Sequence, residues 1–228
     1  MDYVPSAIRH RLLCLFVNCL AIIGYNITFL TEGTKEKIMF TNKRIGLGIT
    51  GSFCTLQELL PYAKILATGN TVTSVLSYSV AGFDTRFYKS CDFKRDIAAA
   101  TGGAIIETIA DAEPIGPKKL FDIMIIAPCT GNTLAKLCSG ITDTPVLMAA
   151  KAHLRNDRPL VIAVSTNDAL GLNAKNIGLL LSSRNIYFVP LRQDDPANKL
   201  RSAISDLSKL EDACQKALLG EQLQPILL

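Results

Sequence analysis

The stretch Asp122–Asp143 restricts most strongly what this chain can fold into. It comprises a buried apolar strand over 121–127, a short loop of small and hydroxyl residues over Ala127–Thr133, and a helix starting at Thr133–Cys138. Open α/β sheets bind ligands at this place, beyond the carboxyl end of a strand and against a helix N-terminus. Because the loop is uncharged and its side chains are small, it suits a phosphate or a flat ring with polar edges.

Strand-like and helix-like patterns alternate along the chain. The predicted strands cover 44–50, 71–77, 104–109, 121–127, 158–164 and 186–189. The predicted helices cover 56–67, 93–100, 133–138, 145–154, 173–182 and 196–219. Pro61 is expected to break or kink the first helix, and Asp92 to cap the second. The alternation predicts one α/β domain, a Rossmann-like doubly wound, mostly parallel sheet of about six strands in a three-layer α/β/α arrangement.

Composition excludes several classes of protein. With 49% hydrophobic and 19% charged residues, the chain should be globular and well packed. Its formal net charge is +4, without a basic run interleaved with aromatic residues, which argues against nucleic acid as a partner. Seven scattered cysteines, none in a Cys-x-x-Cys pair, fit the reduced thiols of a cytoplasmic protein, and the presence of only two histidines argues against a metal site.

The first 38 residues differ in pattern from the rest. Residues 12–30 are nearly all apolar, interrupted by Asn18 and Asn26 and preceded by Arg9–Arg11. They are open to three interpretations: a signal peptide, an extra helix or membrane anchor, or an artefact of a start assigned upstream of Met39. The missing small-x-small cleavage site and the two Asn residues argue against export and spanning. We therefore treat 1–38 as a doubtful extension of a domain covering 43–219, with no membrane partner.

Gly46–Gly51 formally matches the dinucleotide fingerprint G-x-G-x-x-G. That motif should follow a strand, but here the strand has hardly begun, so Gly46 and Gly48 are predicted to lie within it. The second strand ends at Ser77–Ser79, and no acidic residue that could bind a ribose occurs before Asp84. Binding of NAD(P) by this chain is therefore disfavoured.

Three polar loops follow predicted strands: Gly51-Ser52, Ser77–Ser79 and Pro128–Thr133. Because the carboxyl ends of parallel strands meet at one edge of a sheet, we expect the loops to converge. The Gly51-Ser52 turn could bind one phosphate through backbone N–H groups, the helix dipole and the Ser52 hydroxyl. Ser52 could instead serve only as a helix cap, but the convergence of the loops favours a ligand site.

Four further side chains each allow a functional and a structural interpretation. Cys129 could be a nucleophile at a helix N-terminus, but no base is near it in sequence, so a small filler in a tight loop is favoured. His153 is expected on the surface. Lys136 could bind a carboxylate or phosphate or simply be solvated, and Asp143 could cap or orient the loop after Gly140.

Gly48–Ser52, Ala127–Lys136 and Gly140–Asp143 together resemble the flavoprotein family that includes phosphopantothenoylcysteine decarboxylase, lantibiotic Cys decarboxylases and flavin prenyltransferase. The match covers nearly all of 43–190. The resemblance implies that the Gly-Ser turn and the loop after the fourth strand hold FMN. The residues it places around the flavin are Gly51, Ser52, Ser77, Ser79, Cys129, Thr130, Gly131, Asn132 and Thr133.

The chain departs from the decarboxylases at two places. They carry an active-site His after the second or third strand, whereas here no His occurs between Arg44 and Ala152. Their Pro-Ala-Met-Asn loop corresponds to Val164–Asn176, where only Asn167 aligns. The resemblance therefore does not extend to Cys decarboxylation.

Val164–Asn176, together with Gly51–Thr55, Ser77–Val80 and Asn185–Pro196, is similar to one branch of this family. That branch supplies the second, non-dehydrogenase chain of a two-chain synthase in spore-forming bacteria. The resemblance implies oxidation of dihydrodipicolinate, formed from 4-hydroxy-tetrahydrodipicolinate, to aromatic pyridine-2,6-dicarboxylate in the cytoplasm of the mother cell. It also implies a partner, a nicotinamide-binding A subunit that carries NADP. A further implication is that this chain forms a homo-oligomer.

A substrate with two carboxylates needs cationic or hydrogen-bonding partners. Candidates in this chain are Lys136, Asn167, Lys175 and Arg192. Two alternatives to the oxidising subunit stay open, namely a non-catalytic scaffold that positions the A subunit and a stand-alone FMN-dependent decarboxylase or prenyltransferase.

Overall fold

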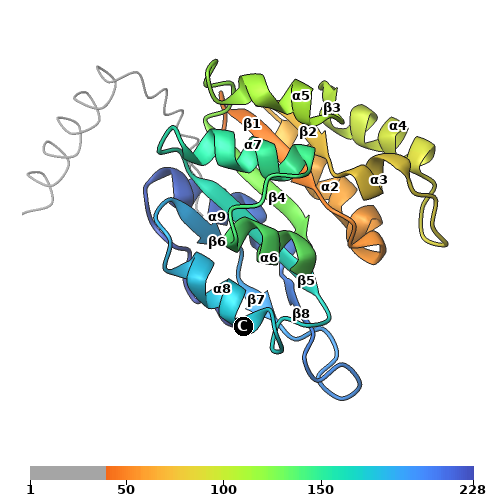
Figure 1. Ribbon diagram of the computed structural model, residues 1–228, viewed down its shortest axis with the longest axis vertical. Helices are drawn as coiled ribbons and strands as arrows, with labels where there is room; N and C mark the ends of the chain where they lie inside the picture. Colours follow the sequence, from red (N-terminus) through yellow and green to blue (C-terminus); the bar gives the residue numbers. More distant parts are fainter. Residues whose placement is uncertain (1–39) are drawn as a thin grey trace, which may run out of the picture. The chain divides into compact units, whose positions relative to one another are not determined.

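The apolar runs of the sequence form the strands of one sheet. The order of these strands reverses at the centre of the sheet. The computed structural model describes residues 40–228 (Figure 1). Six strands lie parallel in the order β3-β2-β1-β4-β5-β6. β8 pairs antiparallel with the carboxyl end of β5, and β7 pairs antiparallel with β8. The strands are β1 (Arg44–Ile49), β2 (Thr71–Leu76), β3 (Ile105–Ile106), β4 (Ile123–Cys129), β5 (Leu160–Thr166), β6 (Ile186–Phe188), β7 (Leu191–Arg192) and β8 (Ala203–Ser205).

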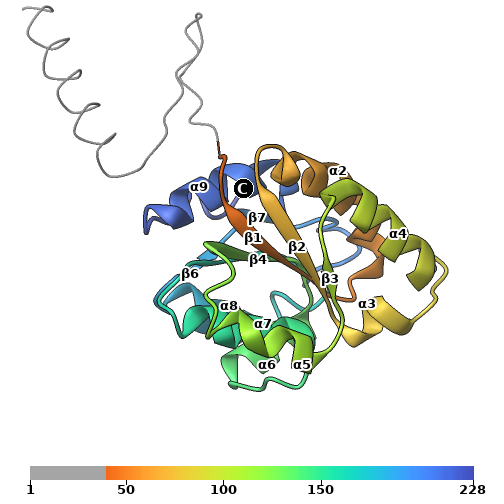
Figure 2. The same ribbon diagram turned by 90° about the horizontal axis from the view of Figure 1, so that it is seen from above.

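Helices cover both faces of this sheet, which confirms the predicted three-layer α/β fold (Figure 2). One core lies between the sheet and α2, α4 and α9, and the other between the sheet and α5, α6, α7 and α8. The helices are α2 (Leu56–Ala67), α3 (Tyr78–Gly82), α4 (Ser90–Thr101), α5 (Ile109–Ala112), α6 (Gly131–Cys138), α7 (Pro145–Leu154), α8 (Ala174–Leu181) and α9 (Leu210–Leu218). The 3-10 turns are η1 (Phe53–Thr55), η2 (Glu113–Ile115) and η3 (Leu207–Lys209).

All six predicted strands are present, although their ends differ from the prediction. The third was expected over 104–109, but β3 holds only two residues because the chain turns away after it. Thr108 caps α5 there, accepting a hydrogen bond from the N–H of Asp111 at 3.0 Å. The short β3 forms one edge of the sheet, beside β2.

Gly46 and Gly48 lie inside β1, as predicted, and make room for packing rather than for a nucleotide. A Cβ at Gly46 would overlap the ring of Phe121, and a Cβ at Gly48 would lie 2.9 Å from Cγ1 of Val146 in α7. The apparent dinucleotide fingerprint therefore reflects close contact between β1 and the layer above it.

Two helix predictions need correction, namely the break at Pro61 and the cap at Asp92. Helix α2 continues unbroken through Pro61. The carbonyl that loses its partner belongs to Gln57, which is exposed and can bond to water. Helix α4 begins at Ser90, so Asp92 lies in its first turn and is not the cap. Asp84, six residues before the helix, accepts the Ser90 N–H at 2.9 Å instead.

The helix expected over 196–219 was also wrong in its first half, where β8 and η3 precede α9. Ser205 explains why a strand forms there. Its buried hydroxyl accepts the N–H of Val164 at 2.8 Å and donates to the carbonyl of Val189 at 3.1 Å. These bonds attach β8 to the end of β5, so long-range pairing overrides the local helical pattern.

The segment after α9 completes the sheet at the β6–β7 side. Gln222 pairs with the backbone of Phe188 through two hydrogen bonds of 2.7 and 2.8 Å, and Leu227 bridges Leu191. No helix within residues 40–228 is both long enough and apolar enough to cross a membrane. The apolar segment 12–30 lies outside the described residues.

Candidate functional site

The site lies where β1 and β4 meet, because the order of the parallel strands reverses there. Helix α2 follows β1 and packs in one core, whereas α6 follows β4 and packs in the other. The two chain segments thus leave the sheet toward opposite faces, and a crevice is expected between them at the carboxyl edge. The loops after β2 and β5 end at the same edge, since β1, β2, β4 and β5 are parallel.

Thr50, directly after β1, ties this edge together. Its buried hydroxyl donates to the carbonyl of Pro128 at 2.7 Å and accepts the N–H of Thr130 at 3.0 Å. The backbone N–H of Thr50 also donates to Pro128, at 3.2 Å. One side chain therefore fixes the start of the loop that leads into α6.

Thr130 caps α6 and leaves the first two N–H groups of the helix without an intrahelical partner. Its hydroxyl accepts the N–H of Thr133 at 3.3 Å and lies 3.0 Å from the Thr133 hydroxyl. The N–H groups of Gly131 and Asn132 precede the first intrahelical bond, so they remain available for an anion. Asn132 is exposed, whereas Gly131 and Thr133 are buried.

Gly131 allows close approach between α6 and the loop after β5. A Cβ at this position would lie 2.5 Å from Nδ2 of Asn173 and 2.7 Å from Oγ1 of Thr166. The loop after β4 therefore cannot carry a side chain here without displacing its neighbours.

The Ser52 hydroxyl points across the edge toward β5. Its Oγ lies 2.7 Å from Oγ of Ser165, and the Thr55 hydroxyl lies 3.5 Å from the same oxygen. Beside this group, the hydroxyls of Ser77 and Ser79 lie 3.1 Å apart. Gly51 packs against the latter pair, since a Cβ there would lie 2.7 Å from Oγ of Ser79. The site thus presents hydroxyl and amide groups from four loops.

Cys129 differs from the other residues predicted around a flavin. It is the last residue of β4, and its side chain is fully buried. Burial raises the pKa of the thiol, and the nearby Cys138 raises it further, so a nucleophilic thiolate is disfavoured. Only the backbone of Cys129 is placed to contribute to the edge. This agrees with its interpretation as a filler in a tight loop.

The substrate candidates lie on different elements of the fold. Lys136 donates to Asp143 at 2.5 Å, so its charge is already paired within the chain. Asn167 is exposed after β5 and accepts from the Ser202 hydroxyl at 3.3 Å. Lys175 is exposed on α8 and Arg192 on β7. Lys136 is thus better placed to hold the loop after α6 than to bind a ligand, and the roles of the others stay predictions.

His153 was expected on the surface, and this expectation was wrong. The residue is 1% exposed, and its Nε2 lies 2.9 Å from the carbonyl of Pro159 at the amino end of β5. Burial lowers its pKa to about 4, so the imidazole is neutral at physiological pH. Its position seven residues after Val146, on the apolar stripe of α7, was the sequence signal for burial.

Sequence reasoning missed Thr50, Ser165, Thr166 and Asn173 as parts of the edge. Each follows an apolar strand or opens the next helix, and the hydroxyl residues among them end β1 and β5. A polar residue that ends a strand next to the reversal point was the available signal. Within residues 40–228, no three His, Cys, Asp or Glu side chains form a group that could hold a metal ion.

Comparison with known proteins gives consistent matches. The model of the family described as Flavoprotein matches residues 34–215. The B subunit of dipicolinate synthase from Bacillus subtilis (strain 168) is 46% identical over 187 residues, 82% of this chain and 94% of that protein. Flavin prenyltransferase UbiX of Thermoplasma acidophilum is 31% identical over 96 residues, which are 39% of this chain and 53% of that protein.

A solved structure extends these matches to the fold. The crystal structure of the dipicolinate synthase B subunit from Bacillus halodurans C is 44% identical and superposes with a TM-score of 0.76. The superposition covers 83% of this chain and 97% of that one. The similarity therefore extends over nearly the whole length of that protein.

Proposed function

Because the chain belongs to the flavoprotein family, as its sequence motifs predicted, we propose that it acts as the flavin-binding B subunit of a dipicolinate synthase. The observation that carries the proposal is the set of uncharged donors at the strand-order reversal, formed by Ser52, Thr130 and the first N–H groups of α6. The identity of 46% to a B subunit over most of both chains supports the same function.

FMN fits the donors at this edge. Its phosphate needs N–H and hydroxyl donors, which the Thr130–Thr133 turn and Ser52 offer. Gly51 and Gly131 bring backbone close to the site, because a Cβ at either would meet a polar side chain within 2.7 Å. The residues proposed to hold FMN are Gly51, Ser52, Ser77, Ser79, Cys129 through its backbone, Thr130, Gly131, Asn132 and Thr133.

The proposed reaction removes a hydride and a proton from dihydrodipicolinate, which leaves aromatic dipicolinate. FMN, when bound here, would supply the acceptor for the two electrons. The alternative acceptor is NADP on the partner subunit. This chain would bind and orient the dicarboxylate through Asn167 and Lys175, which are exposed after β5 and on α8. Lys136 would act indirectly, since its pairing with Asp143 holds the loop after α6.

A decarboxylase function is less well supported. Decarboxylation in the similar enzymes is expected to need an imidazole at this edge. Within residues 40–228 the one histidine, His153, is buried against Pro159 at the amino end of β5, where it cannot reach a ligand at the carboxyl edge. The other alternative, a scaffold that only positions the A subunit, predicts that no flavin is retained.

We further propose that the chain forms a homo-oligomer and works with an A subunit in the cytoplasm of the mother cell. Exposed apolar residues around α8 support contact between copies. Four leucines on and before this helix expose their apolar side chains, namely Leu170, Leu172, Leu179 and Leu181.

The test is the visible absorption spectrum of the purified full chain after addition of FMN and desalting. Stoichiometric retained flavin is expected, with about 10- to 100-fold weaker affinity in Ser52→Ala, the range for a lost bond to a charged group. Ser182→Ala is the matched control, since that hydroxyl lies at the C-terminal end of α8 and bonds to Leu179. No flavin retained by the wild type would refute flavin binding and favour the scaffold.

With flavin retained, the second measurement is oxidation of dihydrodipicolinate by the chain together with an A subunit. Formation of dipicolinate that depends on this chain is expected. An A subunit that works equally fast alone would refute the proposed function.

A further inference from the structure

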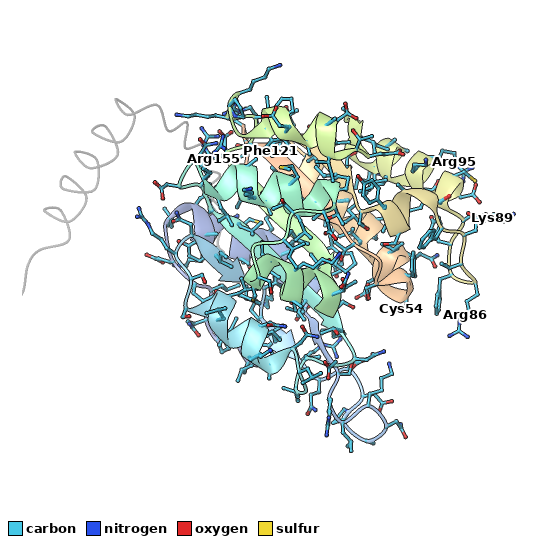
Figure 3. The ribbon with its side chains drawn as sticks, in the orientation of Figure 1. Cys54, Arg86, Lys89, Arg95, Phe121 and Arg155 are labelled. Carbon is cyan, nitrogen blue, oxygen red and sulfur yellow. The ribbon has the colours of Figure 1, made fainter. Side chains whose placement is uncertain are left out.

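The loop Phe83–Lys89, between α3 and α4, carries an unusual group of exposed side chains. Phe83 is 62% exposed and Phe87 50% exposed, and Arg86 and Lys89 are exposed beside them. Figure 3 shows Arg86 and Lys89 extending outward from this loop, away from the sheet. Large aromatic side chains in water are costly, and a cluster of them beside cations is typical of a contact surface.

Internal hydrogen bonds hold this loop in one shape. The Thr85 hydroxyl accepts the N–H groups of Phe87 and Tyr88, both at 3.2 Å, and the Thr85 N–H donates to the Tyr88 carbonyl at 2.9 Å. The Tyr88 ring packs edge-on against Phe93 of α4 at 5.3 Å. Its hydroxyl donates to Asp96 at 2.5 Å. A loop fixed in this way loses little conformational freedom when a partner binds.

The charges of the loop are not neutralised by its neighbours. The Asp84 carboxylate caps α4 through Ser90, at 2.9 Å. Asp92 and Asp96 both pair with Arg95, at 2.9 and 3.1 Å. Within residues 40–228, no ion pair involves Arg86 or Lys89. Arg86 lies 4.7 Å from the centre of the Phe87 ring, so a cation and an aromatic face are presented together.

We propose that the Phe83–Lys89 loop is the docking site for the nicotinamide-binding partner subunit, which meets it with an acidic face. This inference rests on the proposed function. Helix α3 begins at the carboxyl end of β2 and carries Ser79, so the loop that follows it adjoins the candidate flavin site. A partner docked there brings its own cofactor to the same edge of the sheet.

The charge of the loop favours an acidic partner over a second copy of this chain. In a symmetric contact between copies, the same patch meets itself. The loop carries two cations, Arg86 and Lys89, against the one carboxylate of Asp84, so it would face a patch of the same net charge. Like charges across a contact are repulsive, whereas an acidic face would pair with both cations and speed association. The net charge of +4 of this chain adds to the same attraction.

The experiment measures binding of the full chain to a dehydrogenase-like A subunit, with flavin absorbance and self-assembly followed in parallel. The charge-reversal pair Arg86→Glu with Lys89→Glu is expected to weaken binding by about 100-fold and to reduce its dependence on salt. Phe87→Ala should weaken binding by about tenfold. Arg184→Glu, at a side chain 81% exposed between α8 and β6, is the matched control and should bind as the wild type does.

Each result decides the proposal. Weaker binding by the loop variants, with flavin retention and oligomer size unchanged, supports it. Unchanged affinity, or loop variants that instead alter the oligomer of this chain, would overturn it while leaving the proposed function intact. Failure of the wild type to bind the A subunit would overturn the docking site together with the partner that the proposed function requires.

Discussion

Two glycine substitutions on neighbouring helices should change stability in opposite directions. Gly131 opens α6 and is buried, and an added Cβ would lie 2.5 Å from Nδ2 of Asn173 and 2.7 Å from Oγ1 of Thr166. Gly178 lies within α8 and is exposed, with nothing among the described residues within 4 Å of an added Cβ. The same change, Gly to Ala, therefore tests close packing at one position and helix propensity at the other.

Asn173 cannot move aside without loss at Gly131. It accepts from Asn176 at 2.9 Å and donates to Asp168 at 3.4 Å, so a shift weakens a local network. Forcing an extra methyl group into a packed site costs about 1 to 3 kcal/mol. We expect Gly131→Ala to lower the free energy of unfolding by about 2 kcal/mol. Gly178→Ala should raise it by up to about 1 kcal/mol, the difference in helix propensity.

The assay is thermal and urea unfolding of the full chain, with flavin retention measured on the same samples. At about 2 to 4 °C per kcal/mol for a domain of this size, Gly131→Ala should melt about 4 to 8 °C lower. Gly178→Ala should melt up to about 4 °C higher. Weaker flavin retention is expected only in Gly131→Ala. Equal stability of Gly131→Ala and the wild type would refute the packing argument.

Three further predictions concern buried or paired polar groups. Burial of His153 lowers its pKa to about 4, so the unfolded chain binds a proton more readily than the folded chain. The free energy of unfolding should therefore fall by about 3 kcal/mol as the pH drops from 6.5 to 4. His153→Gln should largely abolish this loss in urea titrations at each pH. Burial raises the pKa of Asp122, but the hydrogen bonds from Arg44 outweigh it and lower the pKa overall. Asp122→Asn should therefore lower the free energy of unfolding by about 1 to 2 kcal/mol at pH 7. The difference from the wild type should shrink below the ordinary carboxyl pKa, and a constant difference down to pH 2 would contradict this. Ser74 Oγ is buried without a hydrogen-bond partner among residues 40–228, so Ser74→Ala should leave the melting temperature unchanged or raise it, and a clear fall would contradict this.

The parallel sheet could be predicted from the sequence because each strand forms its own apolar run. The runs at β1, β2, β4 and β5 are long enough to be recognised separately, and both faces of each are buried by helices. The antiparallel pair β7 and β8 could not be predicted in this way. Ile204 sits in β8 because Ser205 bonds to β5 and to Val189, which are far from it in sequence.

The predictions of the α4 cap and of an exposed His153 were wrong for a related reason. An acidic residue just before a hydrophobic run is a sensible guess for a helix cap, yet α4 is capped by Asp84, across a loop whose shape depends on Thr85. His153 lies near charged residues in sequence, but α7 turns it toward Pro159. Local charge describes the sequence neighbourhood, whereas burial depends on which face of the helix meets the sheet.

The candidate site shows what sequence reasoning can and cannot reach in this fold. Loops that end parallel strands must converge, so the approximate position of the site follows from the strand pattern alone. The bonds within it do not, because β1 and β4 become neighbours only in the sheet. Where α2 and α6 diverge from these strands, the N–H of Thr130 needs a new partner. The Thr50 hydroxyl accepts it and at the same time donates to the carbonyl of Pro128. A buried polar backbone group without a partner would cost about 1 to 3 kcal/mol, which gives a hydroxyl residue at the end of β1 a structural reason that no local pattern reveals.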